Sequence, residues 1–223
     1  MAAELAFETL APAVERVWTD EIASIRRDLL VWLQQLAMEG EQWLPKYFEL
    51  GFGPVPGERD RRSLHDEVTL EGGFRLRGAI DLVEEHRTTG ELRVTDHKTG
   101  RRPDRLDRTI VGGGTVLQPV LYAMAVEAGL KRKVTCGRLF YCTSVGGFHE
   151  HPIPLNDMTR DAGLDVLRVI DRGVSEGFLA AAPAPAACER CDFQAVCGPE
   201  VGRRVARKPQ DPLADLTEMR RRP

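Results

Sequence analysis

The chain of 223 residues lacks a long hydrophobic run and a strong charge of either sign. No apolar stretch approaches the roughly 20 residues that cross a bilayer, and the first residues lack the cationic region and apolar core of a signal peptide. These absences favour a cytoplasmic protein without a membrane partner. The 31 basic and 34 acidic residues give a formal net charge of -3, so any nucleic-acid partner must be contacted by a local surface.

Cysteine is sparse and unevenly placed. Of the five cysteines none precedes Cys136, and three lie close together as Cys188, Cys191 and Cys197. An odd number in a chain without a secretion signal argues against a disulfide framework and favours thiols or metal ligands. Iron–sulfur clusters and tetrahedral zinc both use four ligands, of which three are present here. Three ligands with an external fourth, or free thiols, are the alternatives.

The order of hydrophobic patterns predicts an α/β fold, with helices on both faces of a mixed sheet. The helical periods cover 8–38, 115–128 and 157–178, and the strand patterns cover 66–71, 74–84, 91–98, 134–143 and 148–153. A Gly- and Pro-rich break at 51–57 and a Gly- and Arg-rich loop at 100–114 separate them.

We expect four regions along the chain. They are an N-terminal helical segment of the same domain at 1–50, the core at 51–179, an Ala/Pro spacer with the cysteine cluster at 180–200, and a flexible polar tail at 201–223.

Residues 78–98 carry most of the information about chemistry. They read as two strands joined by a turn at Thr88-Thr89-Gly90, with Asp81 on the first strand and Asp96 and Lys98 near the end of the second. Residues two apart in a strand project to the same face. Two carboxylates and an ammonium among apolar neighbours are costly to bury unpaired, and a divalent metal would remove most of that cost. The pattern therefore predicts a metal site, with a buried ion-pair cluster as the alternative.

Three other polar residues lie near this pattern. Gln118 and Tyr122 are four apart on the predicted helix 115–128, so both project from one face, where they could bind a phosphate or orient Lys98. The alternative is an ordinary polar edge of an amphipathic helix. Pro119 fits only in the first turn of this helix. Glu84, after Asp81, is interpreted as a solvated charge.

The order of GAIDLVE, GELRVTDHKTGR, QPVLY and CERCDFQAVC resembles the nuclease domain of the PD-(D/E)XK superfamily. Within it, the sequence is most similar to the RecB/AddB-like exonucleases, over about 45–200. The resemblance implies a restriction-endonuclease-like core with a C-terminal cysteine cluster. It also implies a metal-dependent exonuclease that hydrolyses phosphodiester bonds in DNA during recombination and repair. A helicase partner, separate or fused, would be needed because the chain has no GxxxxGK[ST] loop for ATP.

The resemblance implies a set of metal ligands. Asp81 and Asp96 would bind Mg²⁺ or Mn²⁺ together with the backbone carbonyl of His97, whose imidazole should point to the opposite face. Glu49 precedes the first strands, where related nucleases carry a glutamate that approaches the site. The alternative for Glu49 is a peripheral carboxylate at the end of a strand.

Further roles follow from the same resemblance. Lys98 would position or help deprotonate the attacking water, and Gln118 and Tyr122 would shape the site and contact the DNA backbone. The three C-terminal cysteines would bind a 4Fe-4S cluster, with zinc as the alternative.

Two features of the family have no counterpart here. The fourth cysteine ligand, normally near the N-terminus, is missing, and no histidine precedes His65 to provide the family's Gly-xxx-His helix. We interpret both as the loss of the N-terminal part of the parent domain. The rival function is therefore a catalytically impaired, nuclease-derived module that binds DNA or acts as a scaffold.

Overall fold

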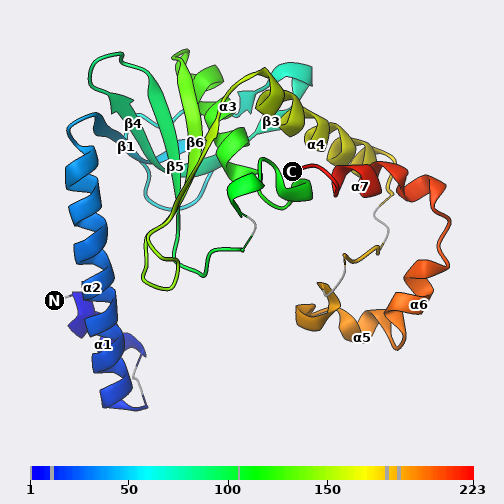
Figure 1. Cartoon of the computed structure of the whole chain (residues 1–223), viewed down its shortest axis with the longest axis horizontal. Coiled ribbons are helices and arrows are strands. Elements are labelled where there is room, and N and C mark those ends of the chain that lie inside the picture. The colour runs from blue at the N-terminus through cyan, green and yellow to red at the C-terminus, as the bar shows by residue number, and fades with distance from the viewer. Residues whose placement is uncertain (1, 11–12, 105, 179–180, 185–186) are drawn as a thin grey trace.

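The computed structural model of the chain describes residues 2–10, 13–104, 106–178, 181–184 and 187–223 (Figure 1). Its centre is a five-stranded sheet in the order β1-β4-β5-β6-β7. The strands are β1 (Trp43–Phe52), β4 (Gly78–His86), β5 (Leu92–Lys98), β6 (Val134–Tyr141) and β7 (Glu150–Pro154). The pair β5 and β6 is parallel and the other pairs are antiparallel, so the sheet is mixed as predicted. A separate two-stranded ribbon joins β2 (Val68–Thr69) to β3 (Arg75–Leu76).

Two α-helices lie on opposite faces of the sheet, and others lie further out. The α-helices of the described residues are α1 (Ala2–Leu10), α2 (Glu15–Glu39), α3 (Gln118–Leu130), α4 (Asp157–Ser175), α5 (Gln194–Cys197), α6 (Val201–Ala206) and α7 (Ala214–Met219). Helix α3 packs against β5 and β6, α4 packs against α3, and α2 meets the opposite face through polar side chains. The expected restriction-endonuclease-like α/β architecture is confirmed. No helix in the described ranges is long and apolar enough to cross a membrane.

The hydrophobic core lies between the sheet and α3. Val83 and Val94 face each other on β4 and β5 and are buried with Val120 and Met124 of α3. The approach of α3 is close because β6 has a glycine beneath it: a Cβ added at Gly137 would lie 1.8 Å from the Pro119 carbonyl oxygen.

Local signals set the ends of the two main core helices. Pro119 lies in the first turn of α3, as its missing N–H requires. Asn156 begins α4 with a capping box, in which its side chain accepts from the Thr159 N–H and the Thr159 hydroxyl accepts from the Asn156 N–H. Helix α3 begins three residues later than the predicted range 115–128 and extends two residues beyond its end, stopping at Leu130 before a left-handed Lys131.

The N-terminal region differs from the prediction. The expected helix 8–38 consists of α1 and α2, and residues 11–12 between them lie outside the described part of the chain. The expected helical segment 1–50 ends early, because residues 43–52 form the edge strand β1. Its pattern is hard to recognise since Pro45 cannot donate to a ladder, and the register shifts between Pro45 and Tyr47.

The C-terminal region also differs. We expected a flexible polar tail at 201–223, and the structure folds these residues into α6 and α7 and seats the last ones on the glycine-rich loop (Figure 1). The N–H groups of Val111 and Gly112 donate to the Pro223 oxygen at 2.8 and 3.1 Å, and Leu213 is buried. In the expected spacer 180–187, residues 180, 185 and 186 lie outside the described residues.

Candidate active site

The paired strands β4 and β5 bring Asp81 next to the end of β5. Val83 pairs with Val94 across the two antiparallel strands. Asp81 and Asp96 each lie two residues beyond this pair, so they occupy the same end of the paired strands. Asp81 Oδ2 accepts a hydrogen bond of 2.7 Å from the backbone N–H of His97. Burial acts to raise the pKa of Asp81, but the hydrogen bonds with the His97 side chain and backbone and the charge of Lys98 lower it overall. Asp81 is therefore an ionised carboxylate held by its neighbours.

Asp96 and Lys98 form a close ion pair. Lys98 Nζ lies 2.6 Å from Asp96 Oδ2, and only 4% of Asp96 is exposed. The contact is short but does not have the angles of a hydrogen bond. Asp96 Oδ2 therefore has no hydrogen-bond partner among the described residues. Burial raises the pKa of Asp96, and the charge of Asp81 adds to this effect while Lys98 opposes it. The two aspartates therefore interact electrostatically, and the buried oxygen of Asp96 is a group that a cation would stabilise.

Gln118 and Tyr122 extend the site from the first turns of α3. Gln118 Oε1 accepts a hydrogen bond of 2.7 Å from Lys98 Nζ, and Gln118 Nε2 donates to the Tyr122 hydroxyl at 3.3 Å. The Tyr122 ring packs edge-on against Phe52 of β1, with 6.2 Å between ring centroids. Gln118 is therefore hydrogen-bonded both to Lys98 and to Tyr122.

The imidazole of His97 lies on the α2 side of the sheet. Its centroid is 5.2 Å from that of Trp32, with the rings at 79°, and 5.9 Å from Phe140. The side chain thus points away from the α3 face, as predicted. Its Nδ1 is 3.6 Å from Asp81 Oδ2, so His97 contacts Asp81 through both its backbone and its ring.

Glu49 is directed elsewhere. It lies on β1 with a φ of 50°, a left-handed conformation that is unusual outside glycine. Its side chain is 54% exposed and pairs with Arg59 Nη1 at 3.4 Å. The structure therefore places the Glu49 carboxylate at the surface of the 58–62 segment, which fits the peripheral alternative.

The donor set fits a magnesium-type ion. Within the described ranges, no three or more histidine, cysteine, aspartate or glutamate side chains gather as a metal-binding group. Mg²⁺, however, is commonly bound through one or two carboxylates and keeps several waters. Asp81 and Asp96 provide two hard oxygen donors of this kind near the end of β5.

The cysteines do not fit the predicted cluster. Cys188, Cys191 and Cys197 are free thiols of intermediate exposure, and they form no metal-binding group in the part of the chain that the structure describes. An iron–sulfur or zinc centre needs its thiolates to converge. The structure shows no such convergence.

Sequence reasoning missed a buried polar network on the α2 face. Glu84, interpreted as solvated, is 1% exposed and accepts from Arg93 Nε at 2.7 Å and Thr95 Oγ1 at 3.0 Å. One sequence signal was available: Arg93 and Glu84 alternate with apolar residues in neighbouring predicted strands. Charged residues at such positions are buried only when they are paired.

Comparison with known proteins identifies the family of the chain and one relative. The sequence profile of the PD-(D/E)XK nuclease superfamily matches residues 1–198. The chain is also 30% identical over 139 residues to the Gene 69 protein of Mycobacterium phage D29. That alignment covers 60% of this chain and 46% of the phage protein, so the chain spans about half the length of this relative. With the match extending over most of its length and a mixed sheet of the expected kind, the chain belongs to the PD-(D/E)XK nuclease superfamily.

Proposed function

We propose that the chain is a metal-dependent exonuclease domain of the RecB/AddB type, which hydrolyses phosphodiester bonds in DNA during recombination and repair. The main support for the proposal is one observation: Asp81, Asp96 and Lys98 lie together at the same end of the paired strands β4 and β5. Membership of a nuclease superfamily supports the reaction class. The DHKTG and QPVLY segments support the RecB/AddB type.

Each residue of the site has a chemical role in this proposal. Asp81 and Asp96 would hold Mg²⁺ or Mn²⁺ with the His97 carbonyl. A metal held there would supply Lewis acidity toward a water and positive charge to offset that growing on the scissile phosphate. Lys98 has three N–H donors; its hydrogen bond to Gln118 uses one and leaves others for the attacking water or a phosphate oxygen. Gln118 keeps the ammonium directed, and Tyr122 fixes the Gln118 amide.

A helicase partner belongs to the same proposal. The RecB/AddB resemblance implies such a partner, and the sequence itself has no GxxxxGK[ST] loop with which to use ATP. We therefore propose that an ATP-dependent helicase supplies the strands.

The test uses labelled linear DNA with Mg²⁺ or Mn²⁺, and a closed circular DNA of the same sequence. We expect the chain to degrade the linear DNA and leave the circle intact. Lys98→Ala should reduce the rate by about 100-fold or more, because it removes a group that acts on the water and the phosphate. Lys133→Ala is the matched control, since Lys133 is exposed and pairs with Glu91 away from the site.

Three outcomes separate the hypotheses. Equal degradation by the Lys98→Ala protein would trace the activity to a contaminant. Cutting of the circular DNA would replace the exonuclease with an endonuclease. DNA binding without hydrolysis under either metal would favour the rival function, a nuclease-derived binding or scaffold module. The surface position of Glu49 is the observation that favours this rival.

A further inference from the structure

Helix α2 meets the sheet through a polar stripe. Asp28, Trp32, Gln35 and Glu39 recur at intervals of three or four residues and therefore share one face of the helix. Asp28 Oδ1 accepts from the Ser144 N–H at 3.1 Å, Trp32 packs on His97, and Glu39 reaches two arginines. No residue of α2 is fully buried. The helix is thus held on the sheet by a few directed contacts, without an apolar core of its own.

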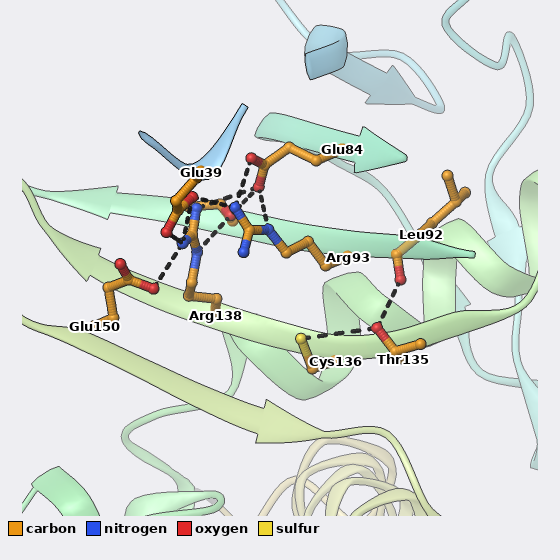
Figure 2. A network of polar contacts seen from close by, with 9 residues as sticks. Glu39, Glu84, Leu92, Arg93, Thr135, Cys136, Arg138 and Glu150 are labelled. Carbon is orange, nitrogen blue, oxygen red and sulfur yellow. Dashed lines mark hydrogen bonds and ion pairs between the residues drawn. The ribbon is translucent and has the colours of Figure 1, made fainter. Parts of the chain in front are cut away.

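Glu39 is the strongest of these contacts (Figure 2). Its carboxylate accepts from Arg138 Nη1 at 2.8 and 3.1 Å and also pairs with Arg93. Arg138 is 1% exposed and also bonds Glu84 at 3.2 Å and Glu150 at 2.7 Å. Because a buried guanidinium must keep its partners, the position of Glu39 is closely determined. The network joins the end of α2 to β4, β5, β6 and β7.

Trp32 lies two helical turns before Glu39 on the same face of α2. Its ring meets the His97 imidazole edge-on, at 5.2 Å between centroids. Trp32 Nε1, Gln35 Oε1 and His97 Nε2 are all buried without a hydrogen-bond partner among the described residues. No hydrogen bond of these atoms among the described residues therefore fixes this ring contact. Its geometry depends on how α2 is anchored on either side of Trp32, by Glu39 and by Asp28.

The contacts that run from Glu39 through Trp32 to His97 reach the candidate metal site. His97 gives Asp81 Oδ2 its 2.7 Å backbone hydrogen bond, and the ring that Trp32 contacts lies 3.6 Å from the same oxygen. A displacement of α2 would therefore move the group that holds Asp81. Neither Glu39 nor Trp32 contacts Asp81 itself in any interaction of the described residues.

We propose that α2 is a positioning element for the metal site: Glu39 anchors the helix, Trp32 seats His97, and His97 holds Asp81 in the orientation that binds a divalent cation. The inference rests on the proposed function for the identity of the site and adds the residues that set its metal affinity. Partners of this kind behind a metal ligand alter affinity by about 10- to 100-fold when they are removed.

The test measures Mn²⁺ binding to the full chain without DNA, by the electron paramagnetic resonance signal of free Mn²⁺. Glu39→Gln and Trp32→Leu should each raise the Mn²⁺ dissociation constant by about 10-fold or more. Their controls on α2 are Glu21→Gln and Leu33→Ala, which change exposed residues and should bind Mn²⁺ as the unaltered chain does. With DNA present, excess Mn²⁺ should restore most of the cleavage rate of both variants, which a loss of fold would not permit.

The outcomes distinguish this inference from the proposed function. Unchanged Mn²⁺ affinity in Trp32→Leu, with the circular dichroism spectrum retained, overturns the positioning role even if Glu39→Gln fails to fold. Absence of Mn²⁺ binding by the unaltered chain overturns the proposed function and this inference with it. The positioning role is supported if Mn²⁺ binds more weakly to Glu39→Gln and to Trp32→Leu but binds both controls as it binds the unaltered chain.

Discussion

Glu39 and Glu150 contact the same guanidinium nitrogen, and the pKa values of their carboxyl groups shift in opposite directions. Arg138 Nη1 lies 2.8 Å from Glu39 and 2.7 Å from Glu150 (Figure 2). Burial raises the pKa of Glu150, and the adjacent Glu39 carboxylate raises it further. Burial also acts to raise the pKa of Glu39, but the hydrogen bond with Glu150 and the charges of Arg138 and Arg93 lower it overall. The pair therefore keeps a proton on Glu150 to a higher pH than an isolated glutamate would.

This difference predicts how stability depends on pH. The folded chain binds the Glu150 proton more tightly than the unfolded chain, so this group contributes stability at low pH. The contribution is lost as pH rises from the ordinary glutamate pKa of 4.5 through the raised value. Glu150→Gln stays neutral throughout. Its melting temperature relative to the unaltered chain should therefore increase as the pH rises above about 4.5, until Glu150 is ionised in the folded chain as well. Thermal unfolding at a series of pH values measures this, and a constant difference would contradict it.

Single residues show why part of the site could be predicted from sequence and part could not. Asp96 and Lys98 are two apart on one strand, and Gln118 and Tyr122 are one helical turn apart, so local geometry alone predicted which residues share a face. The burial of Glu84 could not be predicted in this way, because one of its partners, Arg138, lies 54 residues away in the sequence. No local pattern identifies a partner at that separation, and a lone glutamate is most often solvated.

At the scale of elements, the placement of α3 depends on the absence of one side chain. A Cβ at Gly137 would meet the Pro119 carbonyl oxygen at 1.8 Å and its Cα at 2.8 Å, so the start of α3 would have to move. The same turn carries Gln118, which accepts from Lys98. The packing of β6 against α3 and the orientation of Lys98 are therefore linked through backbone contact.

Gly137→Ala tests this link. We expect the free energy of unfolding to fall by about 1–3 kcal/mol or more, because an overpacked contact with backbone atoms cannot be relieved by rotating a side chain. Gly202→Ala is the control: nothing lies within 4 Å of its added Cβ, and alanine favours the helix α6. Urea denaturation of both variants measures the difference. Equal stability of the two would show that α3 does not approach β6 this closely.

Elements with local end signals were predicted well, and those made by distant contacts were not. Asn156 caps α4 directly before the predicted helical range 157–178, and Pro119 lies in the first turn of α3. The strand β1 was missed, since its partner β4 begins 26 residues after the end of β1, at Gly78. Residues 201–223 appeared featureless because their contact at Val111 lies more than 100 positions earlier in the chain.

At the scale of the whole molecule, the surface is large for the length of the chain. The accessible area is 14638 Å², whereas a compact monomer of this length exposes about 10,000 Å². Two parts stand away from the sheet: the pair of α1 with the N-terminal half of α2, and the segment that contains α5 and α6 (Figure 1). The last residues return to the core at Val111 and Gly112.

This shape predicts an elongated molecule in solution. A compact domain of 223 residues has a radius of gyration of about 17 Å, and the full chain should exceed this value by several ångströms because α1, α5 and α6 lie far from its centre. Small-angle X-ray scattering gives the radius, and light scattering on the same fractions identifies those of monomer mass, since an oligomer would raise the radius for another reason. A monomer at about 17 Å would mean that both parts fold against the sheet, and that α2 has contacts beyond its polar stripe.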